Sequence, residues 1–371
     1  MAKDKAKKKR GFFGRLFRFI GTLLLLVVVL LAALVGWLTF AEYKPADRET
    51  VAVEGTASRS LKTGDSFTIV TWNVGYGSLG DNADYFLDGG KSVNTADKAR
   101  TEENLRSIMR DLNDFAPVDF VFFQEIDLDA TRSNHINELE WMADAIEDWP
   151  NDYAHAFANN FKVAFLPYPV PPIGKVDAGI ATFASYKVSS AERIQLPCPF
   201  SWPVRTINLK RCLLVTRVPL ADSDKELVLV NLHLEAYDSG EGKIAQTKML
   251  AEILNAEQAK GNYVIAGGDF NQIFSSADTA KYPAQEGKWQ AGEIDVTQIA
   301  GDWQFMMDAR VPSCRSLDQP YVGADKSTFQ YYLIDGFIVS GNIKVNTLQT
   351  MDEGFVATDH NPVRMNVTLT K

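Results

Sequence analysis

The chain has 371 residues, of which 46% are apolar and 23% charged, an ordinary composition for a globular protein. The formal net charge is −9, but the first 20 residues carry +7 (eight Lys/Arg against one Asp), which leaves −16 for the rest. That acidity argues against tight nonspecific binding of nucleic acid, which depends on Lys and Arg contacts to phosphates. Three cysteines are too few for a disulfide-stapled scaffold. An oxidising compartment would allow a bridge between Cys198 and Cys212, although free buried thiols are the preferred interpretation.

The N-terminal region predicts a membrane anchor. Residues 1–19 form a basic tail, and residues 20–40 are an uninterrupted run without a charge, long enough as a helix to cross a hydrocarbon core of about 30 Å. A cleavable signal peptide is the alternative, but its apolar region normally has only about 7–15 residues and ends in an Ala-x-Ala-like site. Residues 39–42 match such a site poorly. We therefore expect a single-pass anchor in the cell membrane, with the tail cytoplasmic and the remainder outside the cell.

The rest of the chain predicts a linker and one domain. Residues 41–66 are polar and contain Pro and Gly without an apolar period, which is typical of a tether. From residue 67, helices are predicted near 98–115, 135–149 and 242–260. Apolar runs typical of strands occupy residues 67–73, 119–125, 179–185, 212–220, 226–234, 262–271, 333–340 and 363–370. This alternation predicts an α/β or α+β domain over residues 67–371.

Polar residues of one chemical kind occur at or near the ends of these strands. Burying a carboxylate in a strand costs free energy unless the carboxylate reaches a metal, a cation or solvent. If the strand ends share one edge of the core, they assemble carboxylates, amides and imidazoles, which is the inventory of a hydrolase that uses Mg²⁺ or Mn²⁺. The residues are Asn73, Glu125, His233, Asp269, Asn271, Asp335, Asp359 and His360.

Six short motifs at these positions carry a family resemblance. They are TWN (71–73), QE (124–125), NLHL (231–234), GGDFN (267–271), ID (334–335) and TDH (358–360). In this order and beside predicted strands, the chain resembles the endonuclease/exonuclease/phosphatase superfamily, which includes deoxyribonucleases, inositol polyphosphate 5-phosphatases and neutral sphingomyelinases. The resemblance implies a four-layer α/β/β/α sandwich of two mixed β-sheets with outer helices.

The resemblance also implies roles for the motif residues. Glu125 would bind the metal directly, with Asn73 and Asp359 nearby, and the ion would be Mg²⁺ or Mn²⁺, with Ca²⁺ as a further candidate. Asp269 and Asn271 would orient the attacking water and the phosphate, with Asp269 a candidate base. Two histidines complete the set: His360, oriented by Asp335, would contact the scissile phosphate or move a proton, and His233 would bind phosphate or assist the leaving oxygen.

Taken singly, each of these residues also has a structural interpretation. Asn73, Asp335 and the GGDFN residues could cap or form turns, Glu125 could face water, His233 could be a core histidine, and TDH could be a loop entering the last strand. Jointly, their order favours catalysis. The two other histidines, His135 and His155, match no motif and are interpreted as surface or structural residues.

Three segments are candidates for setting the substrate. Residues 75–97 form a Gly- and Asp-rich loop that could cover the metal, bind Ca²⁺ or simply be solvated. Residues 157–176 are rich in aromatic residues and proline, and could form a lip for a lipid or sugar or cover a sheet edge. Residues 197–211 hold a basic cluster beside Trp202 that could meet a substrate phosphate.

Three functions follow from the sequence. The favoured one is a membrane-anchored phosphoesterase acting on a phosphodiester such as a lipid headgroup or a small ester. The alternatives are a tethered extracellular nuclease that degrades DNA and a non-catalytic binding protein on the same fold. The membrane, through residues 20–40, is the expected partner besides the substrate, and no obligate protein partner is inferred.

Overall fold

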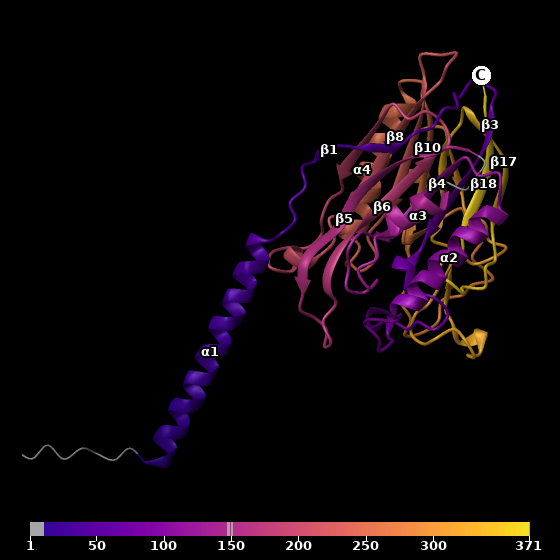
Figure 1. Ribbon diagram of the computed structural model, residues 1–371. Coiled ribbons are helices and arrows are strands. Elements are labelled where there is room, and N and C mark those ends of the chain that lie inside the picture. The colour runs from indigo at the N-terminus through magenta and orange to yellow at the C-terminus, as the bar shows by residue number, and fades with distance from the viewer. Residues whose placement is uncertain (1–10, 147–148, 150, 371) are drawn as a thin grey trace, which may run out of the picture.

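The computed structural model describes residues 11–146, 149 and 151–370. Residues 1–10 of the predicted tail, residues 147 and 148 of the second predicted helix and the last residue of the predicted domain lie outside that part. The first element, α1 (Phe12–Phe40), is one continuous helix of 29 residues. Its most apolar stretch has a mean hydropathy of 2.9 and no buried residue. Figure 1 shows α1 projecting away from the rest of the molecule.

Part of the predicted linker belongs to the folded domain. The prediction that residues 41–66 form a tether is therefore wrong for the residues that form strands. Residues 41–66 contain two short strands, β1 (Arg48–Val51) and β2 (Val53–Gly55). β1 pairs with one large sheet and β2 with the other. The two strands are short and polar, so they show no apolar alternation. Their main-chain groups are nevertheless satisfied by hydrogen bonds to the sheet edges.

Two seven-stranded mixed sheets form the domain, each with one parallel pair. The order of the first sheet is β1, β7 (Ser190–Gln195), β8 (Cys212–Pro219), β9 (Glu226–His233), β10 (Tyr263–Asp269), β16 (Asp335–Ser340) and β13 (Trp303–Met306). The order of the second sheet is β17 (Ile343–Thr350), β18 (Val363–Leu369), β3 (Ser66–Asn73), β4 (Phe120–Asp127), β6 (Gly174–Ala184), β5 (Ala154–Leu166) and β2.

Smaller elements lie in the connections between the strands. Two short pairs join β11 (Gln272–Phe274) to β12 (Gly292–Ile294) and β14 (Cys314–Arg315) to β15 (Tyr331–Tyr332). The single-turn 3₁₀ helices are η1 (Gly75–Gly77), η2 (Phe86–Asp88), η3 (Val204–Ile207), η4 (Val296–Gln298) and η5 (Lys326–Thr328).

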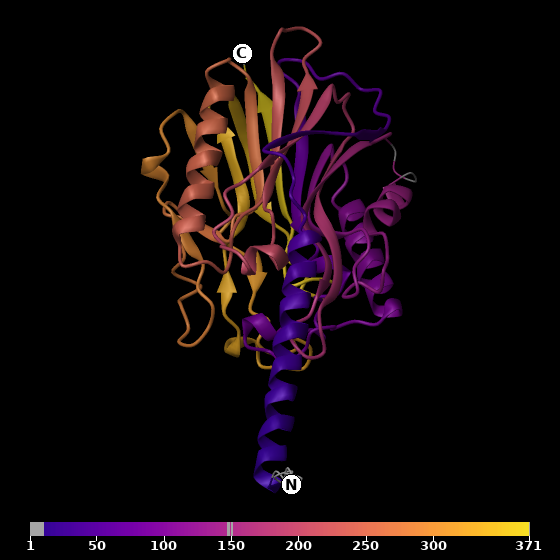
Figure 2. The same cartoon turned by 90° about the vertical axis from the view of Figure 1, so that its left-hand side faces the viewer.

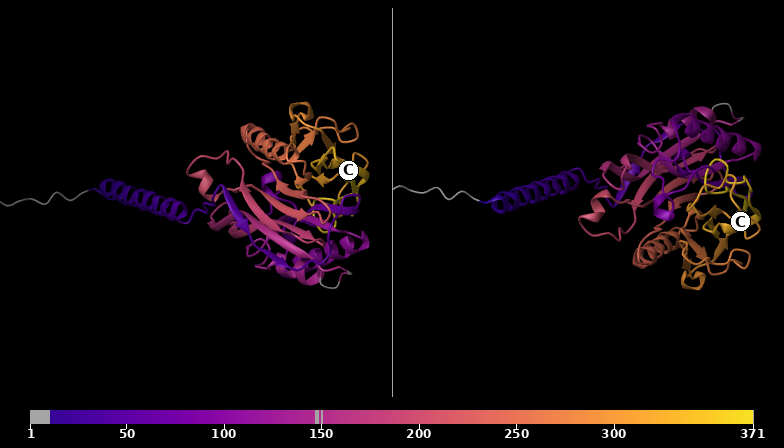
Figure 3. Two further views of the ribbon diagram at one scale, coloured as in Figure 1. Left: turned by 90° about the horizontal axis from the view of Figure 1, so that it is seen from above. Right: turned by 90° about the horizontal axis from the view of Figure 1, so that it is seen from below.

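Helices cover the outer faces of the two sheets, which gives the predicted four layers. α2 (Lys98–Asp114) and α3 (Glu138–Ile146) pack on the second sheet through a cluster that includes Leu105 and Trp72. α4 (Glu241–Gln258) packs on the first sheet through Leu250 and Leu254. Figures 2 and 3 show the sheets lying face to face between these helices. The predicted fold class is therefore confirmed.

In each large sheet, the face that meets the other sheet carries both the apolar core residues and the polar residues predicted for the site. In β4, Phe120 and Phe122 enter the cluster between the sheets, whereas Val121 and Phe123 face the helices, as the two-residue period of a strand requires. Along the same inner face, apolar side chains give way to polar ones toward one end, which we call the site end. There the inner positions are Asn73 of β3, His233 of β9, Asp269 of β10 and Asp335 of β16.

Candidate active site

The first sheet aligns three polar side chains in one row. Asp269 of β10 lies opposite His233 in the parallel pair with β9 and opposite Asp335 in the antiparallel pair with β16. Residues opposite one another on neighbouring strands project to the same face, so an imidazole and two carboxylates stand side by side. All three are at most 5% exposed.

Asn73 connects this row with the second sheet. Its Nδ2 donates to Asp269 Oδ2 at 3.1 Å and to Glu125 Oε1 at 3.2 Å, and its Oδ1 accepts from the backbone N–H of Gly75 at 3.1 Å. In this orientation the amide positions two carboxylates, and its oxygen is already shared with the backbone.

Glu125 reaches the site through an irregularity in β4. The pairing of β4 with β6 shifts register between Phe123 and Ile126, and Glu125 has φ +58°, in the left-handed region. A non-glycine residue in that region is strained, and such strain is common at functional sites. Asn271, which follows β10, has φ +51°, and its backbone N–H donates to Asp269 Oδ1 at 2.8 Å while its Nδ2 donates to the carbonyl of Leu234 at 3.0 Å.

The segment before β18 supplies Asp359 and His360. Two contacts with the end of β3 fix it: Trp72 Nε1 donates to the carbonyl of His360 at 2.9 Å, and Thr358 Oγ1 donates to that of Asn73 at 3.2 Å. His360 Nδ1 lies 2.9 Å from Asp335 Oδ2, and its Nε2 lies 3.9 Å from both Asp269 Oδ2 and Asp359 Oδ2. The predicted His360–Asp335 pair is thus present.

The two imidazoles are in opposite electrostatic environments. Burial, together with the positive charges of Arg211 and His360, holds the pKa of His233 well below its usual range. Burial would also lower the pKa of His360, but the charges of Asp335 and other nearby groups outweigh burial and raise that pKa well above its usual range. The surroundings therefore favour the neutral form of His233 and the protonated form of His360.

The carboxylates are held in an unfavourable environment. Burial and the neighbouring charge of Asp335 raise the pKa of Asp269 to about 7. Burial also raises the pKa of Glu125, and although Arg132 partly offsets this effect, the charge of Asp359 adds to it. Among the described residues, no Lys or Arg nitrogen lies within 4.0 Å of these carboxylates, which have only imidazoles at that distance.

A divalent cation fits this donor set. Asp335 Oδ1 and His233 Nδ1 are buried without a hydrogen-bond partner. Ligand atoms of Asp269, Asp335 and His360 lie within 4.8 Å of one another, as do those of Cys314, Asp359 and His360. Carboxylate oxygens favour a hard ion that keeps several of its waters, and a buried cation would balance carboxylates that lack Lys or Arg partners.

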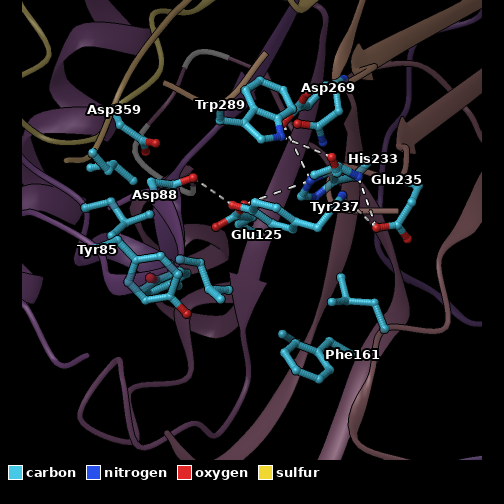
Figure 4. A pocket seen from close by; sticks show the side chains of 18 of the residues that line it. Tyr85, Asp88, Glu125, Phe161, His233, Glu235, Tyr237, Asp269, Trp289 and Asp359 are labelled. Atoms are coloured by element: carbon cyan, nitrogen blue, oxygen red, sulfur yellow. Dashed lines mark hydrogen bonds and ion pairs between the residues drawn. The ribbon is translucent and has the colours of Figure 1, made fainter. Parts of the chain in front are cut away.

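A cavity of about 390 Å³ opens over these groups. Six of the eight predicted site residues line it: Glu125, His233, Asp269, Asn271, Asp359 and His360. Asn73 and Asp335 contact the lining residues from behind. Figure 4 shows Glu125, His233 and Asp269 in one part of the cavity and Phe161 in another. The lining therefore combines a polar floor with apolar walls.

Several residues of this cavity were not among the predicted site residues. In the loop after β3, Asp88 accepts a hydrogen bond from Tyr237 at 3.1 Å, and burial and Asp359 raise the pKa of Asp88 to about 7. Arg132 also lines the cavity and pairs with Asp127 at 2.8 Å. Trp289 was missed as well. Of these, only Asp88 had a sequence signal, the acidic loop 75–97.

The two histidines that were predicted to be surface or structural residues, His135 and His155, lie away from the cavity lining. His135 is exposed beside Asp129, with Nδ1 2.6 Å from Oδ1, and His155 stacks on Phe183. All three cysteines are free; Cys212 and Cys314 are buried, whereas Cys198 is exposed. The prediction that the thiols are free is confirmed. The prediction that they are buried holds for Cys212 and Cys314 but is wrong for Cys198.

Comparisons with known proteins agree with this architecture. Residues 70–360 match the Endonuclease/Exonuclease/phosphatase family. Among solved structures, one endonuclease/exonuclease/phosphatase from Beutenbergia cavernae is 15% identical, with a TM-score of 0.55 over 82% of this chain and 72% of that one. Another from Bacteroides vulgatus is 13% identical, with a TM-score of 0.52 over 82% and 99%.

A family protein from Leptotrichia buccalis is 16% identical, with a TM-score of 0.51 over 81% of this chain and 99% of that one. At these identities the likeness shows the fold alone. No curated protein sequence matches the chain. The match over residues 70–360 nevertheless spans most of the sequence and all eight site residues, and the chain belongs to the Endonuclease/Exonuclease/phosphatase family.

Proposed function

We propose that this protein is a membrane-anchored, metal-dependent phosphoesterase that hydrolyses a phosphodiester outside the cytoplasm. The observation that carries the proposal is the convergence of Glu125, Asp269, Asp335 and Asp359 with the imidazoles of His233 and His360. Family membership supports phosphoester hydrolysis as the type of reaction. The cavity is larger than a bare phosphate needs, which favours an ester with organic groups.

Each side chain has a task that follows from its surroundings. Asp269, with its pKa raised to about 7, is poised to accept a proton from an attacking water at neutral pH. Asp335 fixes His360 and favours its protonated form, in which the imidazole donates a hydrogen bond to a phosphoryl oxygen and stabilises the negative charge that develops there. His233 is neutral and buried beside Asp269, so it can hydrogen-bond the leaving oxygen.

Glu125 and Asp359 would hold a Mg²⁺-type ion, with Asn73 positioning Glu125. When bound, that ion supplies positive charge to the phosphoryl oxygens. Asn271 fixes Asp269 through its backbone N–H, which keeps the carboxylate directed toward the cavity.

The anchor proposal rests on α1 and the charges before it. The helix is long and apolar enough to span a bilayer, and the basic residues on its N-terminal side favour a cytoplasmic N-terminus. A signal sequence would satisfy the same criteria of length and hydropathy. However, Thr39 of α1 accepts a hydrogen bond from Trp202 at 2.9 Å, a contact that favours retention of the helix. Mass measurement of the mature membrane-bound chain tests this, because cleavage near residue 40 would contradict an anchor.

The activity test uses the full chain in lipid nanodiscs. Bis-p-nitrophenyl phosphate, p-nitrophenyl phosphate and plasmid DNA are supplied with Mg²⁺, Mn²⁺, Ca²⁺ or EDTA. We expect turnover of the diester that EDTA abolishes and that falls at least about 10²-fold in Asp269→Asn. Glu257→Gln, a substitution at the opposite end of the domain, is the matched control. Absence of turnover with every metal contradicts the proposal, and plasmid nicking without diester selectivity would favour the nuclease.

A further inference from the structure

Exposed apolar side chains gather at the site end of the domain. Outside α1, the large apolar residues that are exposed in the described structure all lie on segments that adjoin this end. They are Leu87, Phe165, Tyr168, Val170, Trp202, Val204, Tyr237, Ile244, Val322 and Val356. At the opposite end, the described turns at 62–65, 221–225, 260–262 and 341–342 contain none. Such an asymmetric patch marks an interaction surface.

The helix α1 leaves the domain beside this patch. Only seven residues separate the end of α1 at Phe40 from the start of β1 at Arg48, and several contacts fix them. Besides the Trp202–Thr39 hydrogen bond, Glu42 pairs with Lys210 at 3.2 Å and with Arg205 at 3.4 Å. Figures 1 and 2 show α1 extending on the side toward which the β5–β6 hairpin points. A bilayer that holds α1 would therefore meet the site end.

The apolar part of the cavity connects this surface with the polar floor. One cluster joins Phe161, Leu166 and Ile173 of the β5–β6 hairpin to Phe86 of the loop after β3 and to Ile207 and Leu209 of the β7–β8 connection. The same side chains line the cavity that contains Glu125 and His233. Tyr168 and Val204 line it too and are 65% and 50% exposed, so they stand at its rim.

We propose that the site end rests on the bilayer that holds α1, and that the apolar wall of the cavity binds the hydrocarbon tail of a membrane-borne phosphate ester. Val170, 93% exposed at the hairpin tip, contacts the bilayer, while the cavity aligns the phosphate with Glu125 and His360. This inference names the substrate class of the proposed phosphoesterase and rests on that proposed function. A water-soluble polar ester would leave the apolar wall without a partner.

A homologous series of substrates tests the tail site. The full chain in nanodiscs is given p-nitrophenyl esters of methyl, butyl and hexyl phosphate, which differ only in tail length. We expect KM to fall about two- to fourfold for each added methylene that enters the wall. In Val204→Asp this dependence should flatten, because a charge at the rim opposes entry of the tail. Equal KM values along the series, or an unchanged dependence in Val204→Asp, would overturn the inference.

A vesicle assay tests the bilayer contact. The full chain is co-reconstituted with p-nitrophenyl hexadecyl phosphate in phosphatidylcholine vesicles. Because a charge at the apolar membrane boundary is unfavourable, Val170→Glu should lower hydrolysis about tenfold or more, with bis-p-nitrophenyl phosphate turnover unchanged. Val170→Leu keeps the apolar contact, and Ser223→Glu adds the same charge at an exposed turn of the opposite end. Equal loss in Ser223→Glu, or no loss in Val170→Glu, means that the surface serves something other than the bilayer.

A binding measurement separates failure of this inference from failure of the proposed enzyme. Glu125→Gln in nanodiscs is titrated by calorimetry with methyl phosphate and with hexyl phosphate, which requires no turnover. Tighter binding of hexyl phosphate, lost in Glu125→Gln/Val204→Asp, supports the tail site even if no ester is hydrolysed. Equal binding of the two ligands by Glu125→Gln, together with hydrolysis of bis-p-nitrophenyl phosphate by the wild-type chain, overturns the tail site and leaves the phosphoesterase intact.

Discussion

Asp269 at the site end and Glu257 at the opposite end of the domain are both poorly exposed carboxylates, yet their surroundings differ. Burial would raise the pKa of Glu257, but hydrogen bonds from Arg217, Lys260 and Asn262 outweigh it and lower the pKa to about 2. Arg217 Nη2 lies 2.6 Å from its Oε1, and Lys260 Nζ lies 2.8 Å from the same oxygen. Burial and the charge of the neighbouring Asp335 instead raise the pKa of Asp269 to about 7.

The difference separates a carboxylate that stabilises the fold from one to which we assign a chemical role. Around Glu257, cations within the chain neutralise the charge. Around Asp269, negative groups gather without a Lys or Arg partner at ion-pair distance in the described structure, which costs stability unless a cation or proton arrives. An arrangement that opposes folding at one end of a well-packed domain is expected at a functional site.

The largest expected effect comes from removing a charge at the site end. Glu125→Gln should lower kcat/KM for a phosphodiester by about 10³-fold or more, equivalent to about 4 kcal/mol. The amide keeps the shape of the side chain but cannot neutralise a divalent ion. The same variant should lose the rise in Tm that Mg²⁺ gives the wild-type chain. Activity above a tenth of the wild-type value, or an unchanged Mg²⁺ effect on Tm, would contradict the assignment of Glu125 as a metal ligand.

A smaller loss is expected when the residue behind His360 is changed. Asp335→Asn keeps a hydrogen-bonding group 2.9 Å from Nδ1 but removes the charge that favours the imidazolium. We expect kcat to fall about 10²-fold with little change in KM, because Asp335 acts through His360 and does not line the cavity. The free energy of unfolding should change little, because the lost ion pair with His360 is offset by the removal of repulsion with Asp269. Loss of activity that merely follows loss of folded protein would point to a structural residue.

Much of the site could be predicted because strand alternation carries the information. Phe67 and Ile69 face the partner sheet, so Asn73 is placed on the same inner face by counting in twos. The same count applies to His233 and Asp269 at the ends of β9 and β10. A polar residue that continues an apolar inner face can therefore be recognised from the amino-acid sequence alone.

Other features could not be predicted because they depend on contacts distant in the chain. β1 and β2 are held by main-chain pairing with β7 and β5, which leaves no side-chain pattern. The Tyr237–Asp88 hydrogen bond joins loops that are 149 residues apart. Glu125 was found as a strand end, but its turn into the cavity depends on the register shift against β6.

The smallest effect is expected at the opposite end, where Glu257→Gln should change stability and leave activity unaltered. The folded-state pKa of about 2 lies below the usual 4.5, so the carboxylate contributes stability above pH 4.5 and loses it as the pH falls toward 2. Lys260 is 58% exposed and Arg217 26%, and solvent screening therefore limits the loss at pH 7 to about 1–2 kcal/mol.

Urea unfolding at pH 7 and pH 3 measures this loss, which should shrink by more than half at the lower pH, while diester hydrolysis at pH 7 stays within about twofold of wild type. A loss of stability that is equal at both values of pH would mean that packing, and not charge, holds this end together. The contrast with Asp269 would then concern only one carboxylate. If the loss depends on pH as expected, the two ends differ in whether the chain itself supplies the cations that its buried carboxylates require.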